Sequence, residues 1–168
     1  MRVLQTSALC LTAILTACGG LSVYEESNGD GSGSISSGAV ATDVVRYTND
    51  ARVKNGRSPV SSSPRLMEAA RIHAQQMASH GQMEHTISGA QYPTMQSRLQ
   101  AVGYVYANAA ENIAWNVINA KRAVDGWMNS EGHRANILDP QLTEMGAAVA
   151  QNARGETYWV QVFGRPRP

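Results

Sequence analysis

The stretch that decides the fold is Met145–Gly164, MGAAVAQNARGETYWVQVFG, near the end of a chain of 168 residues. It consists of two short segments rich in apolar residues, MGAAVAQN and TYWVQVFG, separated by the polar sequence ARGE. Short apolar segments around a brief connection that contains glycine are typical of a β-hairpin. The pattern therefore predicts two antiparallel strands at the C-terminal end of the chain.

Before this hairpin, the apolar residues recur with a different spacing along the chain. Apolar residues recur at helical spacing in four segments: 41–55, 64–80, 94–102 and 119–129. Helices that come first and strands that come last favour an α+β domain over alternating βαβ units. The sequence therefore predicts an α+β fold, and no internal repeat complicates this interpretation.

The N-terminus is typical of an export signal and not of a folded domain. Residues 1–18, MRVLQTSALCLTAILTAC, combine a positive Arg2 with a mainly apolar stretch that is too short for a permanent membrane span. Its end, Leu15–Cys18, resembles the lipobox of bacterial lipoproteins. We therefore predict a lipoprotein signal peptide at 1–17 and, on Cys18, several acyl chains that make a stable membrane anchor. The alternative is an ordinary secretory signal with a chance cysteine.

Removal of residues 1–17 leaves 151 residues, enough for one domain with its own core. The loss of Arg2 leaves thirteen basic and thirteen acidic residues, so no basic surplus points to nucleic acid. Cys10 is removed with the signal, and Cys18 is then the one remaining cysteine. The domain therefore has no disulfide, and a catalytic cysteine is excluded if Cys18 carries lipid.

A linker is predicted between the lipidated cysteine and the domain, over residues 18–38. Twelve of the twenty residues from Gly19 to Gly38 are Gly or Ser, and a chain of that composition has a root-mean-square reach of about 25 Å. The resemblance to lipoproteins implies that Gly19, in place of aspartate, favours sorting to the outer membrane in a cell with two membranes. The predicted domain covers 39–168.

Three polar residues stand at positions where sites are built. His85, in GQMEHT, follows the predicted helix 64–80 on irregular backbone. Glu111 interrupts the neutral, apolar run AAENIAW, where it is either a solvated strand end or a carboxylate drawn into a cleft. His133, in SEGHR, is expected just outside the end of the helix 119–129. None of the three is decisive by itself.

Other polar residues have simpler interpretations. His73 lies on the apolar side of its predicted helix, where a lone histidine is typically a hydrogen-bonded core residue. His80 lies in the last turn, where an imidazolium favours the negative end of the helix dipole. Ser130 precedes His133 by three residues, but no G-x-S-x-G turn surrounds it, so we expect local capping and not a nucleophile. The chain contains no HExxH, CxxC or glycine-rich phosphate loop.

A set of motifs in a fixed order resembles one known family. The motifs are YTNDARVKNG, AARIHAQQMASHG, MEHT, SRLQAVGY, ENIAW, GWMNSEGHRANILD, EMGAAVA and YWVQVFG. Over residues 40–164 the chain resembles bacterial domains of the CAP superfamily, the SCP-like proteins related to cysteine-rich secretory proteins, antigen 5 and pathogenesis-related 1. The resemblance implies an α-β-α sandwich, with a central antiparallel sheet between helix layers.

The same resemblance implies a cleft lined by His85, Glu111 and His133. Ser130 stands where many members have a second glutamate, which weakens a mechanism with two carboxylates; its hydroxyl is expected to bond to a histidine or to a metal-bound water. Family members bind divalent cations through the histidine pair, so His85 and His133 are the predicted ligands, with zinc the favoured ion. Glu111 would orient a bound water or hold an imidazole tautomer.

Three functions remain open for such a domain. The favoured one is a membrane-anchored binding module in the cell envelope, whose cleft takes a lipid, glycan, peptide or other small-molecule ligand. The second is a metal-dependent hydrolase of peptide or cell-wall material, with Glu111 as general base. The third is a structural envelope protein in which these residues only cross-link helices and sheet. We expect a monomeric domain that binds no nucleic acid.

The anchor can be tested by the substitution Cys18→Ser. Without the thiol no lipid can be attached, so the variant should move from the membrane fraction to the soluble fraction. Cell fractionation with an antibody against the protein measures this. Equal solubility of the parent and the variant would contradict lipidation.

Overall fold

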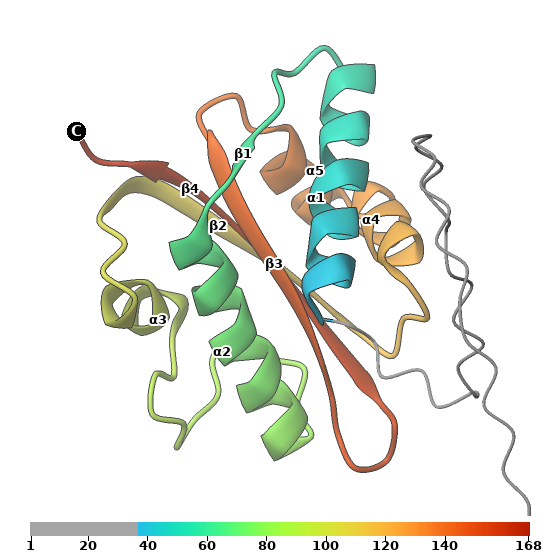
Figure 1. Cartoon of the computed structure of the whole chain (residues 1–168), viewed down its shortest axis with the longest axis vertical. Coiled ribbons are helices and arrows are strands. Elements are labelled where there is room, and N and C mark those ends of the chain that lie inside the picture. The colour runs from blue at the N-terminus through green and yellow to red at the C-terminus, as the bar shows by residue number, and fades with distance from the viewer. Residues whose placement is uncertain (1–36) are drawn as a thin grey trace, which may run out of the picture. The chain divides into compact units, whose positions relative to one another are not determined.

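The computed structural model describes residues 37–168; the predicted signal peptide, Cys18 and most of the linker lie outside the described residues. Helices and strands follow along the chain as α1 (Ser37–Lys54), β1 (Ser61–Ser62), α2 (Pro64–His80), α3 (Met95–Ala101), β2 (Tyr106–Trp115), α4 (Ala120–Met128), α5 (Glu131–Leu138), β3 (Glu144–Gln151) and β4 (Thr157–Pro166) (Figure 1). None of the helices from Ser37 onward is both long and apolar enough to cross a membrane.

The strands form one sheet in the order β1–β3–β4–β2. β3 and β4 pair as the predicted antiparallel hairpin, from Glu144 opposite Gly164 to Gln151 opposite Thr157. β2 runs antiparallel along the other side of β4, so β4 is central and its residues are buried from Thr157 to Gly164. β1 adds a two-residue parallel pair with β3, which makes the sheet mixed.

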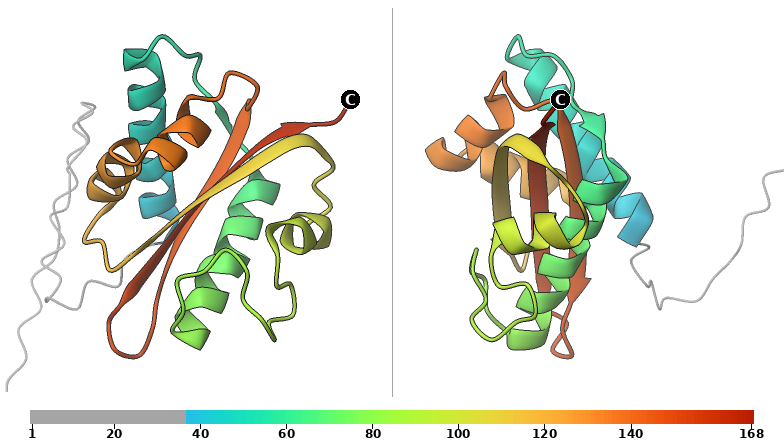
Figure 2. Two further views of the ribbon diagram at one scale, coloured as in Figure 1. Left: turned by 180° about the vertical axis from the view of Figure 1, so that it is seen from behind. Right: turned by 90° about the vertical axis from the view of Figure 1, so that its left-hand side faces the viewer.

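Helices cover both faces of this sheet (Figure 2). On one face α2 packs against β3, β4 and α3, and on the other α1 packs against β3 and α4, while α5 contacts α4 and β2. Alternate residues of β4 enter two cores because side chains of a strand alternate in direction. Val160 and Val162 face the core under α2, and Trp159 and Phe163 face the core under α1 and α4. The predicted α-β-α sandwich of an α+β protein is confirmed.

Strand β2 is a difference from the helices-then-strands order expected from sequence, because it lies between α3 and α4. Its residues, YANAAENIAW, are mostly Ala, Asn and Glu, which have low strand propensity. Pairing with β4 along almost its whole length, together with cover from the helices, outweighs that weak local preference.

Helix α5 is a second difference, and it corrects the expected position of His133. His133 was expected outside a helix end, but it lies inside α5, which begins at Glu131. Ser130 adopts extended backbone at the N-cap position, and Glu131 places an acid in the first turn, where the helix dipole favours it. A new helix therefore starts almost where α4 stops.

β2 is an edge strand of the sheet, and α5 lies beside it. The Asn136 side chain donates a hydrogen bond to the backbone carbonyl of Glu111 at 3.4 Å, and Asn108 Nδ2 donates to Asp139 Oδ2 at 3.2 Å. A helix over an edge strand hides backbone groups that another chain would otherwise pair with. The edge of β2 is therefore the place where elements of both helical layers can meet.

A buried arginine of α1 holds the end of α5 in place. Arg52 donates to the carbonyl oxygens of Ile137 at 2.6 Å, Asp139 at 3.1 Å and Leu142 at 3.3 Å. The last carbonyl groups of a helix have no partner within it, so the guanidinium satisfies groups that would otherwise be buried and unpaired. Arg52 thereby positions the helix that carries His133.

Candidate functional site

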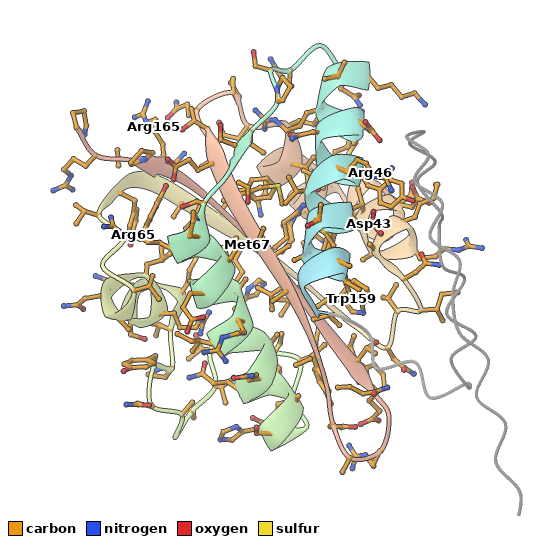
Figure 3. The ribbon with its side chains drawn as sticks, viewed as in Figure 1. Asp43, Arg46, Arg65, Met67, Trp159 and Arg165 are labelled. Atoms are coloured by element: carbon orange, nitrogen blue, oxygen red, sulfur yellow. The ribbon has the colours of Figure 1, made fainter. Side chains whose placement is uncertain are left out.

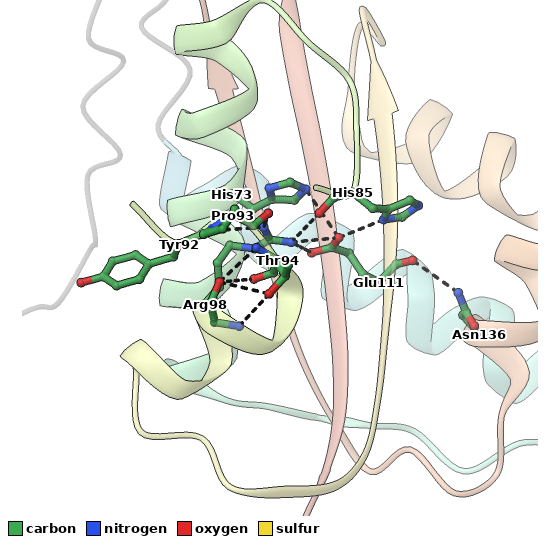
Figure 4. Close-up of polar contacts among 9 residues, drawn as sticks. His73, His85, Tyr92, Pro93, Thr94, Arg98, Glu111 and Asn136 are labelled. Atoms are coloured by element: carbon green, nitrogen blue, oxygen red, sulfur yellow. Dashed lines mark hydrogen bonds and ion pairs between the residues drawn. The ribbon is translucent and has the colours of Figure 1, made fainter. Parts of the chain in front are cut away.

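Glu111 lies in the middle of β2 and is the centre of a cluster of ionisable side chains (Figure 4). Only 3% of its side chain is exposed. His85 Nδ1 lies 2.9 Å from Oε1, and because a carboxylate only accepts hydrogen bonds, this ring nitrogen is the donor. Arg98 Nη2 donates to Oε1 at 3.2 Å and to Oε2 at 3.0 Å. The carboxylate therefore faces its partners and not open solvent.

Arg98 is a second centre of this cluster. It is 1% exposed, and besides Glu111 it donates to the carbonyl oxygens of His85 at 3.1 Å and Pro93 at 3.1 Å. It therefore connects α3 and both ends of the segment 85–93 to β2. His85 owes its position to two contacts, one from its backbone to Arg98 and one from its ring to Glu111.

The charges of the cluster keep Glu111 ionised. Burial alone would raise the pKa of this carboxyl, but the hydrogen bond from His85, together with the charge and hydrogen bonds of Arg98, outweighs it, so the pKa of Glu111 lies below its usual value. The hydrogen bond with Glu111 in turn raises the pKa of His85, against a smaller opposing effect of burial. Glu111 is thus a fixed negative charge under an exposed imidazole.

His85 presents its free ring nitrogen outward. Its side chain is 56% exposed, although Nδ1 is bonded to the buried Glu111. In the neutral ring, a proton on Nδ1 leaves a lone pair on Nε2. This arrangement of carboxylate, imidazole and outward nitrogen is the one found behind metal-binding and ligand-binding histidines. Of the two roles expected for Glu111, the geometry supports holding an imidazole tautomer.

His73 completes the buried side of the cluster. It is fully buried on α2, with Nε2 3.5 Å from Glu111 Oε1, and burial is the main reason that its pKa falls to about 4. It was expected to be a hydrogen-bonded core residue, and it is in the core, but neither ring nitrogen has a hydrogen-bond partner within residues 37–168. At neutral pH His73 is therefore an uncharged, buried ring next to Glu111.

His133 approaches the same edge of the sheet from the other helical layer. Its backbone carbonyl accepts a hydrogen bond from Asn112 Nδ2 at 3.1 Å, and Asn136 donates to Asn112 Oδ1 at 2.9 Å. The ring is partly buried, and burial together with the nearby charge of His85 lowers its pKa. The structure thus places His133 at the same edge of β2 as Glu111, with its backbone bonded to the neighbouring Asn112.

Ser130 is beside this group but not bonded to it. It is the N-cap residue of α5, yet its hydroxyl makes no capping hydrogen bond. No hydrogen bond joins it to His85 or His133 within the described part of the chain. Across residues 37–168 no three His, Cys, Asp or Glu side chains come close enough together to hold a metal ion. A cation here would have His85 and His133 as its protein ligands.

Arg98 and the asparagines of the site were not found from the sequence. Arg98 lies in a short helix beside the buried Leu99, and an arginine at a position that faces the core is a signal, because a buried cation needs an anionic partner. Asn112, fully buried beside Glu111, gives no such signal in the sequence. His80 has the role expected of it, since Nδ1 lies 2.9 Å from the Gln76 carbonyl in the last turn of α2.

Comparison with known proteins agrees with this fold. The profile of the Cysteine-rich secretory protein family, CAP, matches residues 45–163. The chain belongs to the CAP family. The match lies within residues 40–164, where the resemblance was seen, and includes Glu111 and both cleft histidines.

Two proteins of one bacterium are similar to this chain in sequence. The protein YkwD of Bacillus subtilis (strain 168) is 34% identical, with 83% of this chain and 52% of that protein covered. The membrane protein YlbC of the same organism is 32% identical, with 71% of this chain and 33% of that protein covered. The chain therefore spans about half and about a third of the lengths of these two relatives.

Two solved structures have the same fold. An extracellular protein of Bacillus anthracis str. Ames that contains an SCP domain superposes with a TM-score of 0.68 at 26% identity, over 77% of this chain and 41% of that chain. An outer surface protein of Borrelia burgdorferi has a TM-score of 0.67 at 18% identity, over 75% of this chain and 92% of that chain. The second likeness concerns the fold alone.

The ion pair of Arg98 and Glu111 can be tested by a double-mutant cycle. Glu111→Gln or Arg98→Met alone should lower the free energy of unfolding by about 3–5 kcal/mol, because each leaves a buried charge unpaired. The double variant should cost clearly less than the sum of the two. Urea denaturation of the soluble Cys18→Ser chain measures this.

The exposed pair of Arg71 and Glu68 is the matched control for this cycle. Its Glu68→Gln variant should change the free energy of unfolding by no more than about 1 kcal/mol. Strictly additive effects at Arg98 and Glu111 would show that the two side chains do not act as a unit.

Acid should destabilise the CAP domain through His73. The pKa of His73 is about 4 in the folded chain and near 6.5 in the unfolded chain. Between those values the unfolded chain binds the extra proton, so the free energy of unfolding falls as pH drops from about 6.5 to 4, by up to about 1.4 kcal/mol per pH unit. His85, whose pKa is raised, acts in the opposite sense.

The free energy of unfolding is therefore measured by urea denaturation at several pH values between about 4 and 6.5, for the parent and for His73→Gln. The difference between their slopes against pH is the contribution of His73. The His80→Gln variant, altered at an exposed histidine of the same helix, should keep the parent slope. A His73→Gln slope equal to that of the parent would contradict the assignment.

Proposed function

We propose that this chain is an exported, membrane-anchored CAP domain that binds an envelope or extracellular ligand through the imidazoles of His85 and His133. The proposal rests on the arrangement of the side chains around Glu111. Its two oxygens are engaged by Arg98 and His85, inside the protein, and the group that faces solvent is the His85 ring. A buried anion that supports an outward imidazole is suited to binding.

The same geometry disfavours a hydrolase with Glu111 as general base. A general base needs a pKa near the working pH and direct access to the water or substrate that it deprotonates. Glu111 is buried, its pKa is lowered, and Arg98 contacts both of its oxygens. Ser130, in the position of the second acid, has no carboxylate to take over this role.

A purely structural role explains only part of the cluster. The link from Arg98 to Glu111 joins α3 to β2 and needs no further group. It does not account for His85, because a ring that is 56% exposed contributes little packing. His85 is exposed and its pKa is raised, whereas the pKa of His133 is lowered. Shifted pKa values of this kind favour a binding site over a purely structural role.

The donor set fits a weakly held divalent cation. His85 Nε2 and the ring of His133 are the two candidate ligands, and Glu111 would fix the tautomer of His85 from behind. Zinc accepts imidazole nitrogen readily, and a bound ion would supply a positive charge that holds an anionic or carbonyl group of the ligand. Two protein ligands are fewer than the usual three or four, so the ligand itself or solvent would complete the set.

The location in the envelope rests on the relatives and on the N-terminal sequence. The solved neighbours include an extracellular protein and an outer surface protein, and one relative is a membrane protein. Lipid on Cys18 would supply the anchor, and Gly19 favours the outer membrane where a cell has two membranes. A lipid, glycan or peptide of the envelope is then the accessible ligand.

Zinc titration of the soluble Cys18→Ser chain tests the cleft. The parent should bind one zinc ion weakly, and His85→Ala or His133→Ala should each weaken binding at least about tenfold, whereas His80→Ala should not. Because protons compete for His85, binding should strengthen as pH rises from 6 to 8. Isothermal titration calorimetry measures all four chains. Equal affinity in all of them would remove the histidine pair as a metal site.

Ligand capture belongs to the same test. Envelope extract is passed over the immobilised parent and over the His85→Ala, His133→Ala double variant, with and without zinc, and retained lipids and peptides are identified by mass spectrometry. Material retained by the parent and lost from the double variant supports the binding function.

A further inference from the structure

Two large apolar side chains are exposed where β2 leads into α4, in the stretch called here the β2–α4 loop (residues 115–119), which begins with the last residue of β2. Trp115 is 48% exposed and Ile118 is 80% exposed. Leaving such side chains in water forgoes the stabilisation that burial would give, and neighbouring exposed apolar groups mark interaction surfaces. The other large apolar side chains that are exposed in residues 38–168 stand singly: Val53, Met83 and Val105.

The loop is held in its conformation by the fold. Asn116 adopts a left-handed backbone, with φ of 54°, which Asn tolerates better than most residues, and its N–H donates to the Thr157 carbonyl at 2.7 Å. The carbonyl of Val117 accepts hydrogen bonds from Thr157 Oγ1 and from Trp159 Nε1, both at 2.9 Å. Val117 is thereby turned inward, and Trp115 and Ile118 remain outward. The exposure is thus built into the structure.

The loop lies on the side of the domain where the chain enters from Cys18. Trp159, which bonds to the loop, belongs to the same core cluster as Val44 of α1, and Val40 packs against that cluster. Figure 3 shows Trp159 beside the first turns of α1. Eighteen residues lie between Cys18 and Ser37. The expected reach of about 25 Å for such a segment would keep this side of the domain close to the anchoring membrane.

One unpaired cation near the loop suits contact with anionic lipid. Lys121 and Arg122 are exposed in the first turn of α4, which contains no acidic residue. Lys121 pairs with Asp125 one turn later at 2.7 Å, which stabilises the helix. Arg122 makes no ion pair within residues 38–168, and a cation at this end opposes the helix dipole, so helix stability does not explain Arg122. Tryptophan, an aliphatic side chain and basic residues together are the composition of a membrane-interface contact.

We propose that the β2–α4 loop, through Trp115 and Ile118, docks the domain on the surface of an anionic lipid bilayer. This inference goes beyond the proposed binding function and uses the lipid on Cys18 only to explain why a bilayer is within reach. Docking at this loop would fix the orientation of the domain, and with it the direction in which the His85 ring faces.

The test uses the chain that begins at Cys18, coupled through its one thiol to a maleimide-bearing lipid in vesicles of phosphatidylglycerol and phosphatidylcholine. The chemical link replaces acylation, so the result does not depend on lipidation in the cell. It also gives the loop a high effective concentration at the surface. Trp127 and Trp159 are buried, so a change in tryptophan emission on coupling reports on Trp115.

Docking predicts a blue shift of the emission, quenching by brominated lipid, and protection from acrylamide. Trp115→Phe should abolish the shift. Ile118→Ser should lower the ratio of docked to free domain about tenfold, the factor that corresponds to one large apolar side chain. Arg122→Gln should lower it about fivefold, and vesicles of phosphatidylcholine alone should give no shift.

Val105→Ser is the matched control. Val105 is 63% exposed and precedes β2, about 33 Å from Trp115 along the strand, so its loss should leave docking unchanged. An unaltered emission on anionic vesicles, or equal effects of Val105→Ser and Ile118→Ser, would overturn the proposal. Zinc titration of the same variants tests the predicted His85 and His133 site separately. A failure of docking and a failure of zinc binding can therefore be told apart.

Discussion

The buried ion pair between Arg98 and Glu111 is the contact on which the site depends. It joins α3 to the middle of β2, and the same guanidinium binds the carbonyl of His85. Two charges that are taken out of water cost several kcal/mol each unless they are paired. The pair is therefore a constraint, because neither partner can move alone. Its consequence at the surface is that His85, although exposed, has a defined position and a defined tautomer.

The second half of the site comes from the other helical layer. His133 reaches the edge of β2 on α5, where Asn112 and Asn136 bond to each other and to the backbone on either side. Arg52 fastens the end of α5 to α1. The candidate site is thus a junction between the two layers over an edge strand, where buried hydrogen bonds to charged and amide side chains set the spacing.

The cleft and the proposed docking loop occupy different parts of one strand. Glu111 is in the middle of β2, and Trp115 is its last residue. A domain that rests on a bilayer at the end of this strand would carry its histidine pair at a fixed height above the lipid, within reach of ligands of the envelope. Both surfaces are exposed features that the fold holds rigid, one through an ion pair and the other through the hydrogen bonds of Val117.

The sequence by itself determined the elements that carry strong local signals. The hairpin of β3 and β4 and helices α1 to α4 follow from apolar period, turn residues and caps, and the ordered motifs identified the family. It did not reveal β2, whose Ala, Asn and Glu have little strand preference, nor α5, which begins almost where another helix ends. Only the tertiary structure decided that Arg98 pairs with Glu111, that His73 stands uncharged behind it, and that Trp115 and Ile118 face outward. The physical reason is that local preference acts between neighbours in the chain, whereas burial and charge pairing act between residues that only folding brings together.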